Sequence, residues 1–371
     1  MNPFATSGDQ RSLAEAFGRF LRDANEFTGR RERLSGSAPD RCALWPSFAE
    51  QGVIAAAFGE SHGGFAGDVR TIAVLMNEIG VALAVEPYLA TAVVAGRIMQ
   101  HWADRAAGQA AIDAIIAGKY ICVLAHNGFG DPFAWPGVEA ASGSGSRLIS
   151  GFIPAVRHAE LAQTFLVPAR LADGSMEIYR IEPGHPGLTI EPFRAIDAAG
   201  AANLRFQDVR IPDSQVVPVD TSCREVIDEA LELAIVGLAA EATGIVYALN
   251  AATFTHLMTR KQFGTVIGSF QALQHRAADM WISAEELLAI VDVGIETVAS
   301  PRSAARDAII SAVKVVADKT GRRVANEAVQ LHGGMGVSDE LIVSHYFRRL
   351  AAIRSELGST DAHRLRFRSK Q

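Results

Sequence analysis

The residues with the clearest chemical potential lie in a short segment near residue 260. Arg260 carries a planar guanidinium fork that can bind a pyrophosphate through paired hydrogen bonds. Phe263 can pack against an apolar cofactor face, and Gly264 allows a close backbone approach. Gln271 can hydrogen-bond the adenine or ribose end of a nucleotide, and Gln262 lies inside the same segment. Together these residues predict a contact with a diphosphate-containing cofactor.

A second segment, from Gln330 to Gly336, has complementary features. Gln330 can also hydrogen-bond an adenine or a ribose. Gly333 and Gly334 lack Cβ atoms, so a diphosphate or ribose could lie directly against the backbone. The alternative interpretation of the glycine pair is a plain turn that ends a helix.

The chain divides into three regions that predict different kinds of secondary structure, and these elements must position the residues named above. Residues 1–118 have apolar side chains at helical spacing and predict an α-helical domain. Residues 119–218 contain short apolar runs bounded by Gly, Pro, Asp or Ser, which predict an antiparallel β-barrel domain. Residues 219–371 contain four long helical runs and predict a four-helix bundle, with helices at 224–260, 270–297, 302–332 and 338–355. The fold class is therefore α+β.

The last residues of the chain are rich in basic side chains. Arg364, Arg366, Arg368 and Lys370 alternate with other residues after the last predicted helix. We expect them to form a solvated tail.

Composition excludes several classes of protein. The net charge is −6 and no basic stripe is present, so we expect no nucleic-acid partner. No apolar run of roughly 18 residues is free of charge, and the first residues lack a signal-peptide pattern, which predicts a cytoplasmic protein without a membrane span. Cys42, Cys122 and Cys223 are odd in number and far apart, so we expect neither a metal site nor a disulfide framework.

The two motifs and the order of the three domains resemble the acyl-CoA dehydrogenase family over essentially the whole chain. The resemblance implies an enzyme that removes two hydrogens from the Cα–Cβ bond of an acyl-CoA and passes a hydride to FAD. It also implies that the Arg260 turn reaches across a subunit interface to the FAD of a neighbour, and that an electron-transfer flavoprotein accepts the electrons. The residues that it assigns to FAD are Arg260, Gln262, Phe263, Gly264, Gln271, Gln330, Gly333 and Gly334.

The catalytic base of the family is missing from its usual positions. The reaction needs a carboxylate to remove the α-proton. Counting from Arg348 places Leu357 at one known base position, and counting back from Arg260 places Ala234 at the other. Neither side chain can accept a proton. Glu356 and Glu241 are weaker candidates, and for Glu241 a paired structural carboxylate is the favoured alternative.

The residues that form the flavin wall in the family are also altered. By counting from the anchors, Ala155 stands where the family has a Trp, and Arg157 stands where it has a Thr. The chain therefore retains the half of a flavin site that one subunit provides to its neighbour, and lacks the half that it would use itself.

This contrast predicts the half-site subunit of a hetero-oligomer with a shared FAD. The chain, especially the stretch from Glu86 to Thr91, resembles the small subunit of two-subunit bacterial acyl-CoA dehydrogenases of the pimeloyl-CoA or steroid-side-chain type. The expected partner is a homologous large subunit, in a dimer or an α2β2 tetramer. Two alternatives remain open: a self-sufficient enzyme with a relocated base at Glu241 or Glu356, and a non-catalytic binding or assembly protein.

Overall fold

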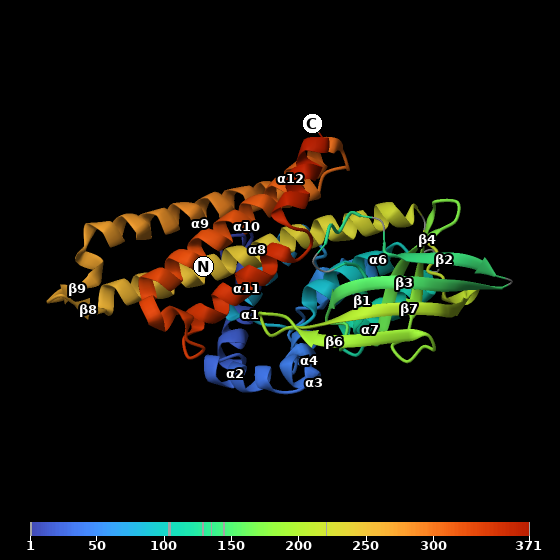
Figure 1. Ribbon diagram of the computed structural model, residues 1–371, viewed down its shortest axis with the longest axis horizontal. Helices are drawn as coiled ribbons and strands as arrows, with labels where there is room; N and C mark the ends of the chain where they lie inside the picture. Colours follow the sequence, from blue (N-terminus) through green and yellow to red (C-terminus); the bar gives the residue numbers. More distant parts are fainter. Residues whose placement is uncertain are drawn as a thin grey trace.

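The computed structural model describes residues 2–102, 105–127, 130–134, 136–143, 145–219 and 221–370. Figure 1 shows a β-sheet at one end of an elongated molecule and long helices that run from the sheet to the other end. The helices of the N-terminal part lie beneath the long helices in this view. The α+β class predicted from the sequence is confirmed.

The N-terminal part is built from short helices around one long apolar helix, α5. Asp68 caps the start of α5 by accepting a hydrogen bond from the Thr71 amide. Beyond α5, a π-helical turn, η3, brings residues 88–95 back towards the core. The elements are α1 (Gly8–Ala24), α2 (Phe27–Ser35), α3 (Ala38–Arg41), α4 (Trp45–Glu50), η1 (Ala55–Ala57), η2 (Glu60–His62), α5 (Val69–Ala82), η3 (Tyr88–Ala95), α6 (Gly96–Gln100) and α7 (Arg105–Ile116).

The middle part forms one seven-stranded sheet with its own apolar core. Its strands follow the order β1-β4-β2-β3-β7-β6, and β5 also pairs with β4. The elements are β1 (Cys122–Leu124), β2 (Val138–Gly143), β3 (Ser146–Arg157), β4 (Thr164–Leu171), β5 (Met176–Ile181), β6 (Leu188–Arg194), β7 (Gly200–Pro212) and the short helix η4 (Asp213–Gln215).

The antiparallel barrel that we predicted for this region is wrong. The sheet does not close, and β4 pairs in parallel with both β1 and β2. Apolar periodicity identifies individual strands, whereas closure and direction depend on which distant strands pair. The sequence pattern contains no direct record of that pairing.

The C-terminal part contains the predicted long helices and one further helix. Its elements are α8 (Cys223–Thr259), β8 (Lys261–Gln262), β9 (Thr265–Val266), η5 (Ile267–Ser269), α9 (Gln271–Val298), α10 (Ala304–His332), η6 (Gly333–Val337), α11 (Ile342–Ser355) and α12 (Thr360–Ser369). The α8 helix has the length and apolar composition of a membrane span, but 94% of its most apolar window is buried within the protein.

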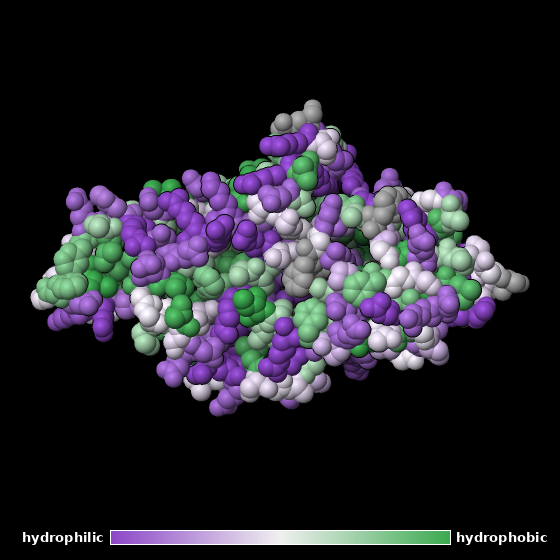
Figure 2. Space-filling view, viewed as in Figure 1, coloured by the Kyte–Doolittle hydropathy of each residue, from purple (hydrophilic) through white to green (hydrophobic). Residues whose placement is uncertain are grey.

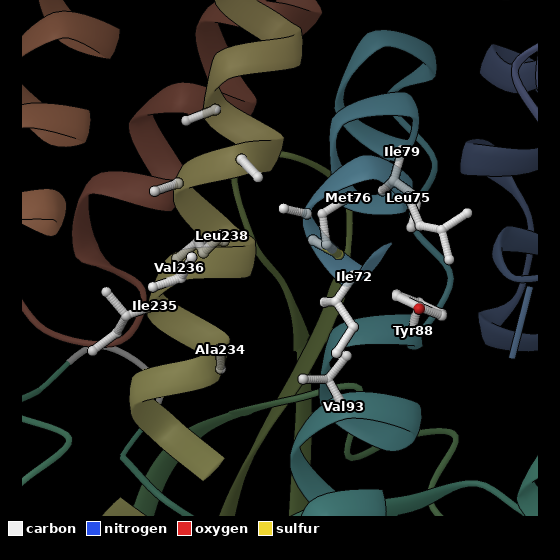
Figure 3. Close-up of a cluster of buried hydrophobic side chains, with 14 of the residues drawn as sticks. Ile72, Leu75, Met76, Ile79, Tyr88, Val93, Ala234, Ile235, Val236 and Leu238 are labelled. Atoms are coloured by element: carbon white, nitrogen blue, oxygen red, sulfur yellow. The ribbon is translucent and has the colours of Figure 1, made fainter. Parts of the chain in front are cut away.

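The N-terminal helices and the bundle share one hydrophobic core. Figure 3 shows α5 facing α8, with Ile72 and Met76 of α5 directed towards Leu238 and its neighbours on α8. The two helices cross in close contact because each has a glycine at the crossing. A Cβ on Gly80 would lie 2.2 Å from the Glu241 carbonyl oxygen, and one on Gly244 would lie 2.2 Å from that of Asn77. Larger residues at these positions would force the helices apart.

Arg364, Arg366 and Arg368 lie on a helix, α12, so the tail that we predicted is wrong. The expected exposure is confirmed for Arg364, Arg368 and Lys370 but not for Arg366. Arg366 of α12 donates to Glu232 on α8 at 2.7 Å and to the Asp307 carbonyl oxygen on α10 at 2.9 Å. Its guanidinium also lies 3.8 Å from the centre of the Phe133 ring. Glu232 is fully buried, so it requires cationic partners from another element. That requirement anchors α12 to the bundle.

Arg366→Ala should lower the stability of the fold because it removes one of the cations that compensate the buried Glu232 carboxylate. We expect a loss of about 2–4 kcal/mol, since Arg306 still pairs with Glu232. The matched control is Arg364→Ala on the same helix, whose side chain is 59% exposed and should change stability by less than about 0.5 kcal/mol. Urea denaturation followed by circular dichroism measures both, and equal midpoints would contradict the anchoring role of Arg366.

Candidate functional site

A small cavity lies where the N-terminal helices, the sheet and the bundle meet. Its lining includes Leu89 of η3, Ala234 of α8 and Leu357, which follows α11. The two positions that the resemblance assigns to the base therefore face the same space, and both carry aliphatic side chains. Figure 3 shows Ala234 on the side of α8 that faces Ile72 and Val93. The cavity has a volume of about 60 Å³.

Five charged side chains form one continuous ion-pair network along the wall of this cavity. Arg349 on α11 donates to Glu241 on α8 at 2.7 Å, to Asp197 at 2.8 Å and to Glu356 at 2.9 Å. Arg157 at the end of β3 donates to Asp197 at 3.0 and 3.2 Å and lies 3.6 Å from Glu356. We call these five residues the cavity network. It joins the sheet to the bundle.

The cavity network balances its charges almost completely. Burial alone would raise the pKa of Asp197 and Glu356, but Arg157 and Arg349 outweigh burial and lower the pKa of both carboxyls. For Glu241, burial is the larger effect and its pKa is raised despite the contact with Arg349. Three acids face two arginines, so the network has one acid in excess, and the raised pKa places the tendency to protonate on Glu241.

This arrangement does not supply a free base for α-proton removal. Glu241 and Glu356, the two candidate bases, are both ion-paired with Arg349. A carboxylate that is held by an arginine is a weaker proton acceptor than an unpaired one in an apolar site. The ion pair with Arg349 is the kind of contact expected for a paired structural carboxylate at Glu241, and its role stays a prediction.

Two histidines, His126 and His158, also line the cavity. Burial, followed by the charge of Arg157, lowers the pKa of His158 to about 3. Burial also lowers the pKa of His126. Both imidazoles are therefore neutral at pH 7, and neither has the raised basicity that a proton acceptor needs.

The residues present here do not fit an isoalloxazine ring. Pockets that hold cofactors or other small molecules typically measure about 300–1,000 Å³, whereas this cavity has room only for a few water molecules. The ion-paired side chains of Arg157 and Arg349 occupy the adjoining space. Ala155, which stands at the Trp position of the family, contributes no ring that could stack near a flavin.

The eight residues predicted to contact FAD lie elsewhere, at the end of the bundle remote from the sheet (Figure 1). We call this region the hairpin end. All eight side chains or backbones are exposed: Arg260, Gln262, Phe263, Gly264, Gln271, Gln330, Gly333 and Gly334. Ala234 and Arg260 are 26 residues apart on α8 and its C-cap, so the cavity and the hairpin end are separated by about 39 Å at ~1.5 Å per residue.

The Arg260 segment folds as a tight hairpin. Lys261 pairs with Val266 and Gln262 with Thr265, which leaves Phe263 and Gly264 as the two turn residues. Their φ angles are 55° and 79°, as a two-residue hairpin turn requires. Phe263 is 83% exposed, and a large side chain is uncommon in this left-handed region. The hairpin therefore presents an aromatic ring to solvent next to Arg260.

The Gly333-Gly334 turn lies close to the hairpin. The rings of His256 on α8 and His332 on α10 stack with centroids 4.3 Å apart, which holds the two helix ends together. Gly333 ends α10 with a φ of 61°, and no atom lies within 4 Å of a Cβ built on it or on Gly334. A diphosphate could therefore approach this backbone. Arg260 forms no ion pair with a described residue, so its guanidinium is available as well.

Asp197 and Arg349 are site residues that were not predicted from the sequence. Asp197 lies in the turn between β6 and β7, in no recognisable motif. Arg349 directly follows Arg348, and its inward direction on α11 could have been inferred from the helical spacing to the apolar Tyr346 and Ile353. The carboxylate partners of Arg349 could not have been inferred from the sequence, because they lie on other elements or beyond the end of α11.

The chain is similar to known proteins in both its sequence and its fold. Residues 224–369 match the family model described as "Acyl-CoA dehydrogenase, C-terminal domain". Acyl-CoA dehydrogenase FadE27 of Mycobacterium tuberculosis is 28% identical over 320 residues, which cover 84% of this chain and 83% of that protein.

Two solved structures share the fold over nearly the whole chain. The ChsE4-ChsE5 complex from Mycobacterium tuberculosis contains a chain with a TM-score of 0.88 and 23% identity, covering 99% of this chain and 98% of that one. The Tcur3481-Tcur3483 steroid ACAD contains a chain with a TM-score of 0.87 and 24% identity, covering 98% and 97%. At these identities the likeness establishes the fold.

Arg349→Met should destabilise the protein because it leaves Glu241 buried without its cationic partner. We expect a loss of about 3–5 kcal/mol at pH 7. Glu241 already has a raised pKa in the folded state, and losing Arg349 raises it further. The folded state of the variant therefore favours the protonated acid, so its stability should fall as the pH rises through that pKa and should recover partly near pH 5.

Thermal denaturation between pH 5 and pH 8 measures this effect. Adding Glu241→Gln to Arg349→Met removes the unpaired charge and should restore part of the stability and flatten the pH dependence. Arg348→Met, which loses contacts with the exposed Asp339 and with the Ser344 carbonyl oxygen but leaves the cavity network intact, is the control. If the double variant were no more stable than Arg349→Met at pH 8, the charge argument would be wrong.

Proposed function

Because the chain belongs to the acyl-CoA dehydrogenase family, we propose that it is the half-site subunit of a hetero-oligomeric, FAD-dependent enzyme. The complex desaturates the Cα–Cβ bond of an acyl-CoA and transfers electrons to an electron-transfer flavoprotein. A homologous large subunit, in a dimer or an α2β2 tetramer, holds the flavin ring and the base. This chain provides the hairpin end, and the complex is cytoplasmic.

The cavity network carries this proposal. In a self-sufficient enzyme, the space beside Ala234 and Leu357 must hold both a flavin ring and the reacting part of an acyl-CoA. Here Arg157, Arg349 and their three carboxylate partners line a cavity of about 60 Å³. Opening that space would require separating buried ion pairs, which is costly. A flavin bound mainly by another chain avoids this cost.

The hairpin end supports the same proposal from the opposite side. Arg260 has no described acidic partner, and the Gly333-Gly334 backbone is open. Apolar side chains are exposed around these groups: Met258 (66%), Phe263 (83%), Met335 (55%) and Val337 (72%). Figure 2 shows apolar surface gathered at this end of the molecule. Exposed apolar patches with polar residues at their rim are typical of protein interfaces.

The likeness to two-chain complexes favours a heteromeric assembly. One of the solved structures named above is the ChsE4-ChsE5 complex, and the other, a steroid ACAD, carries the names of two proteins, Tcur3481 and Tcur3483. We extend the two-chain organisation to this protein. We assign its substrate only as an acyl-CoA thioester.

The residues of this chain have defined roles in the proposed complex. FAD, when bound, accepts the hydride from the β-carbon of the acyl group. The Arg260 guanidinium binds the diphosphate of the cofactor, and the backbone of Gly333 and Gly334 allows close approach. Gln271 and Gln330 hydrogen-bond the adenine or ribose, and Phe263 packs against an apolar face. The α-proton is removed by a base of the large subunit.

The chain purified alone should be colourless and inactive towards acyl-CoA, because its own cavity cannot hold the flavin ring. Co-expression with a homologous large subunit should yield a yellow complex that oxidises acyl-CoA. The measurements are an absorbance scan and a dye-reduction assay on both preparations. A yellow, active preparation of the chain alone would instead establish a self-sufficient enzyme, and a colourless, inactive complex would indicate a binding or assembly protein.

Arg260→Ala in the co-expressed complex should reduce its flavin content. Loss of a charge-assisted diphosphate contact costs about 1.5–3 kcal/mol, which corresponds to roughly 10- to 150-fold weaker flavin binding. Arg170→Ala is a suitable control, since this arginine is 46% exposed on β4 and its acidic partner among the described residues is Glu139. Dialysis followed by a flavin-to-protein absorbance ratio separates the variants. Equal retention of flavin in both would refute the role of Arg260.

A further inference from the structure

A second cleft lies between α2, the β6–β7 turn and the start of α11. It measures about 520 Å³ and is lined by four arginines and a histidine: Arg30, Arg31, Arg194, Arg348 and His345. We call it the arginine cleft. It shares only Asp197 with the lining of the small cavity, and it contains none of the residues of the hairpin end. It is therefore a separate feature from the proposed flavin contact.

Arg30 is the most informative residue of the arginine cleft. It is only 5% exposed, yet it forms no ion pair with a described residue. Its Nε donates to the Leu83 carbonyl oxygen at 2.9 Å, and its Nη1 donates to His345 Nδ1 at 2.9 Å. Burial lowers the pKa of Arg30 to about 10, and nearby Arg348 also lowers it. A buried charge without a counter-ion is costly unless another group supplies the opposite charge.

The remaining donors of Arg30 are available for such a group. Its Nη2 makes no hydrogen bond to a described residue. Arg30 also lines the cleft, so a ligand there could reach this nitrogen. The two contacts on Nε and Nη1 fix the plane of the guanidinium, which leaves its other edge oriented in advance for a bound anion.

The other cations of the cleft are also incompletely neutralised. Arg194 donates to the backbone carbonyl oxygens of Gly36 and Ser35, at 2.7 and 3.3 Å, and has no carboxylate partner among the described residues. Arg31 and Arg348 share one acid, Asp339, with Arg31 at 3.7 Å.

Two further acids line the cleft, and neither forms an ion pair with Arg30 or Arg194 among the described residues, although the charge of Asp197 raises the pKa of Arg30. Glu32 forms no ion pair with a described residue, and Asp197 is held by Arg157 and Arg349 of the cavity network. Four guanidinium groups therefore line the cleft with three carboxylates, Glu32, Asp197 and Asp339, which leaves a positive excess of one charge.

We propose that the arginine cleft is a binding site for a small molecule that carries a diphosphate group. Guanidinium groups bind phosphoryl oxygens through paired, charge-assisted hydrogen bonds. Several such groups around one space suit a ligand with more than one negative charge. The volume of about 520 Å³ accommodates inorganic pyrophosphate and also a nucleoside diphosphate. The proposal is independent of the half-site role.

Isothermal titration of the full chain with inorganic pyrophosphate tests this site. We expect saturable binding to one site, at least 10-fold weaker in Arg30→Gln and in Arg194→Gln. Arg323→Gln, on α10 outside the cleft, is the matched control and should bind like the parent protein. Arg194 is exposed, so Arg194→Gln still tests the site if Arg30→Gln fails to fold.

Two further titrations define the ligand. ADP should bind at least as tightly as pyrophosphate if a nucleotide is the source of the diphosphate, and more weakly if free pyrophosphate is; both results support the site. Equal or tighter binding of citrate would overturn the diphosphate assignment. Absence of pyrophosphate binding at 10 mM, or equal affinity in all three variants, would overturn the site itself. Flavin content of the co-expressed complex should be unchanged in Arg194→Gln, which separates this result from the half-site role.

Discussion

The ion pairs around Arg349 are the interaction on which the rest of this structure depends. One guanidinium on α11 contacts Glu241 of α8, Asp197 of the β6–β7 turn and Glu356 beyond its own helix. These contacts connect the sheet to the bundle in a buried region that has room for only a few water molecules. Because the charges are buried, each carboxylate must keep its arginine, and the small cavity cannot widen without unpaired charge. The space that remains is too small for a cofactor ring.

The buried ion pairs also make the middle of α8 different from its C-terminal end. The cavity network holds the middle of α8 through Glu241, and the far end of α8 carries Arg260 on an exposed hairpin. A 37-residue helix buried along most of its length is stiff, so it sets the distance between a closed centre and an open end. The hairpin end alone is therefore an incomplete cofactor site. It can contact a cofactor of a neighbouring chain only if that chain provides the other residues of the site.

Much of the fold could be predicted from local patterns, and the failures share one cause. Apolar spacing located α8, α9 and α10 to within a few residues, and short runs located the strands. Barrel closure was wrong because it depends on pairing between distant strands. The helical state of α12 was missed because Arg366 is ordered by Glu232, a residue 134 positions earlier in the chain. Local periodicity contains neither of these contacts.

For the candidate site, the sequence by itself determined which residue types are present and which are absent. Ala234 and Leu357 cannot remove a proton in any fold, and Arg260, Gly333 and Gly334 can contact a diphosphate in many. The tertiary structure alone decided that Arg349 meets Glu241, 108 residues away, and Asp197, 152 residues away. These long-range contacts bring the individual charges together into one network. The energy of an ion pair depends on the distance between its charges and on their burial, and not on their positions along the chain.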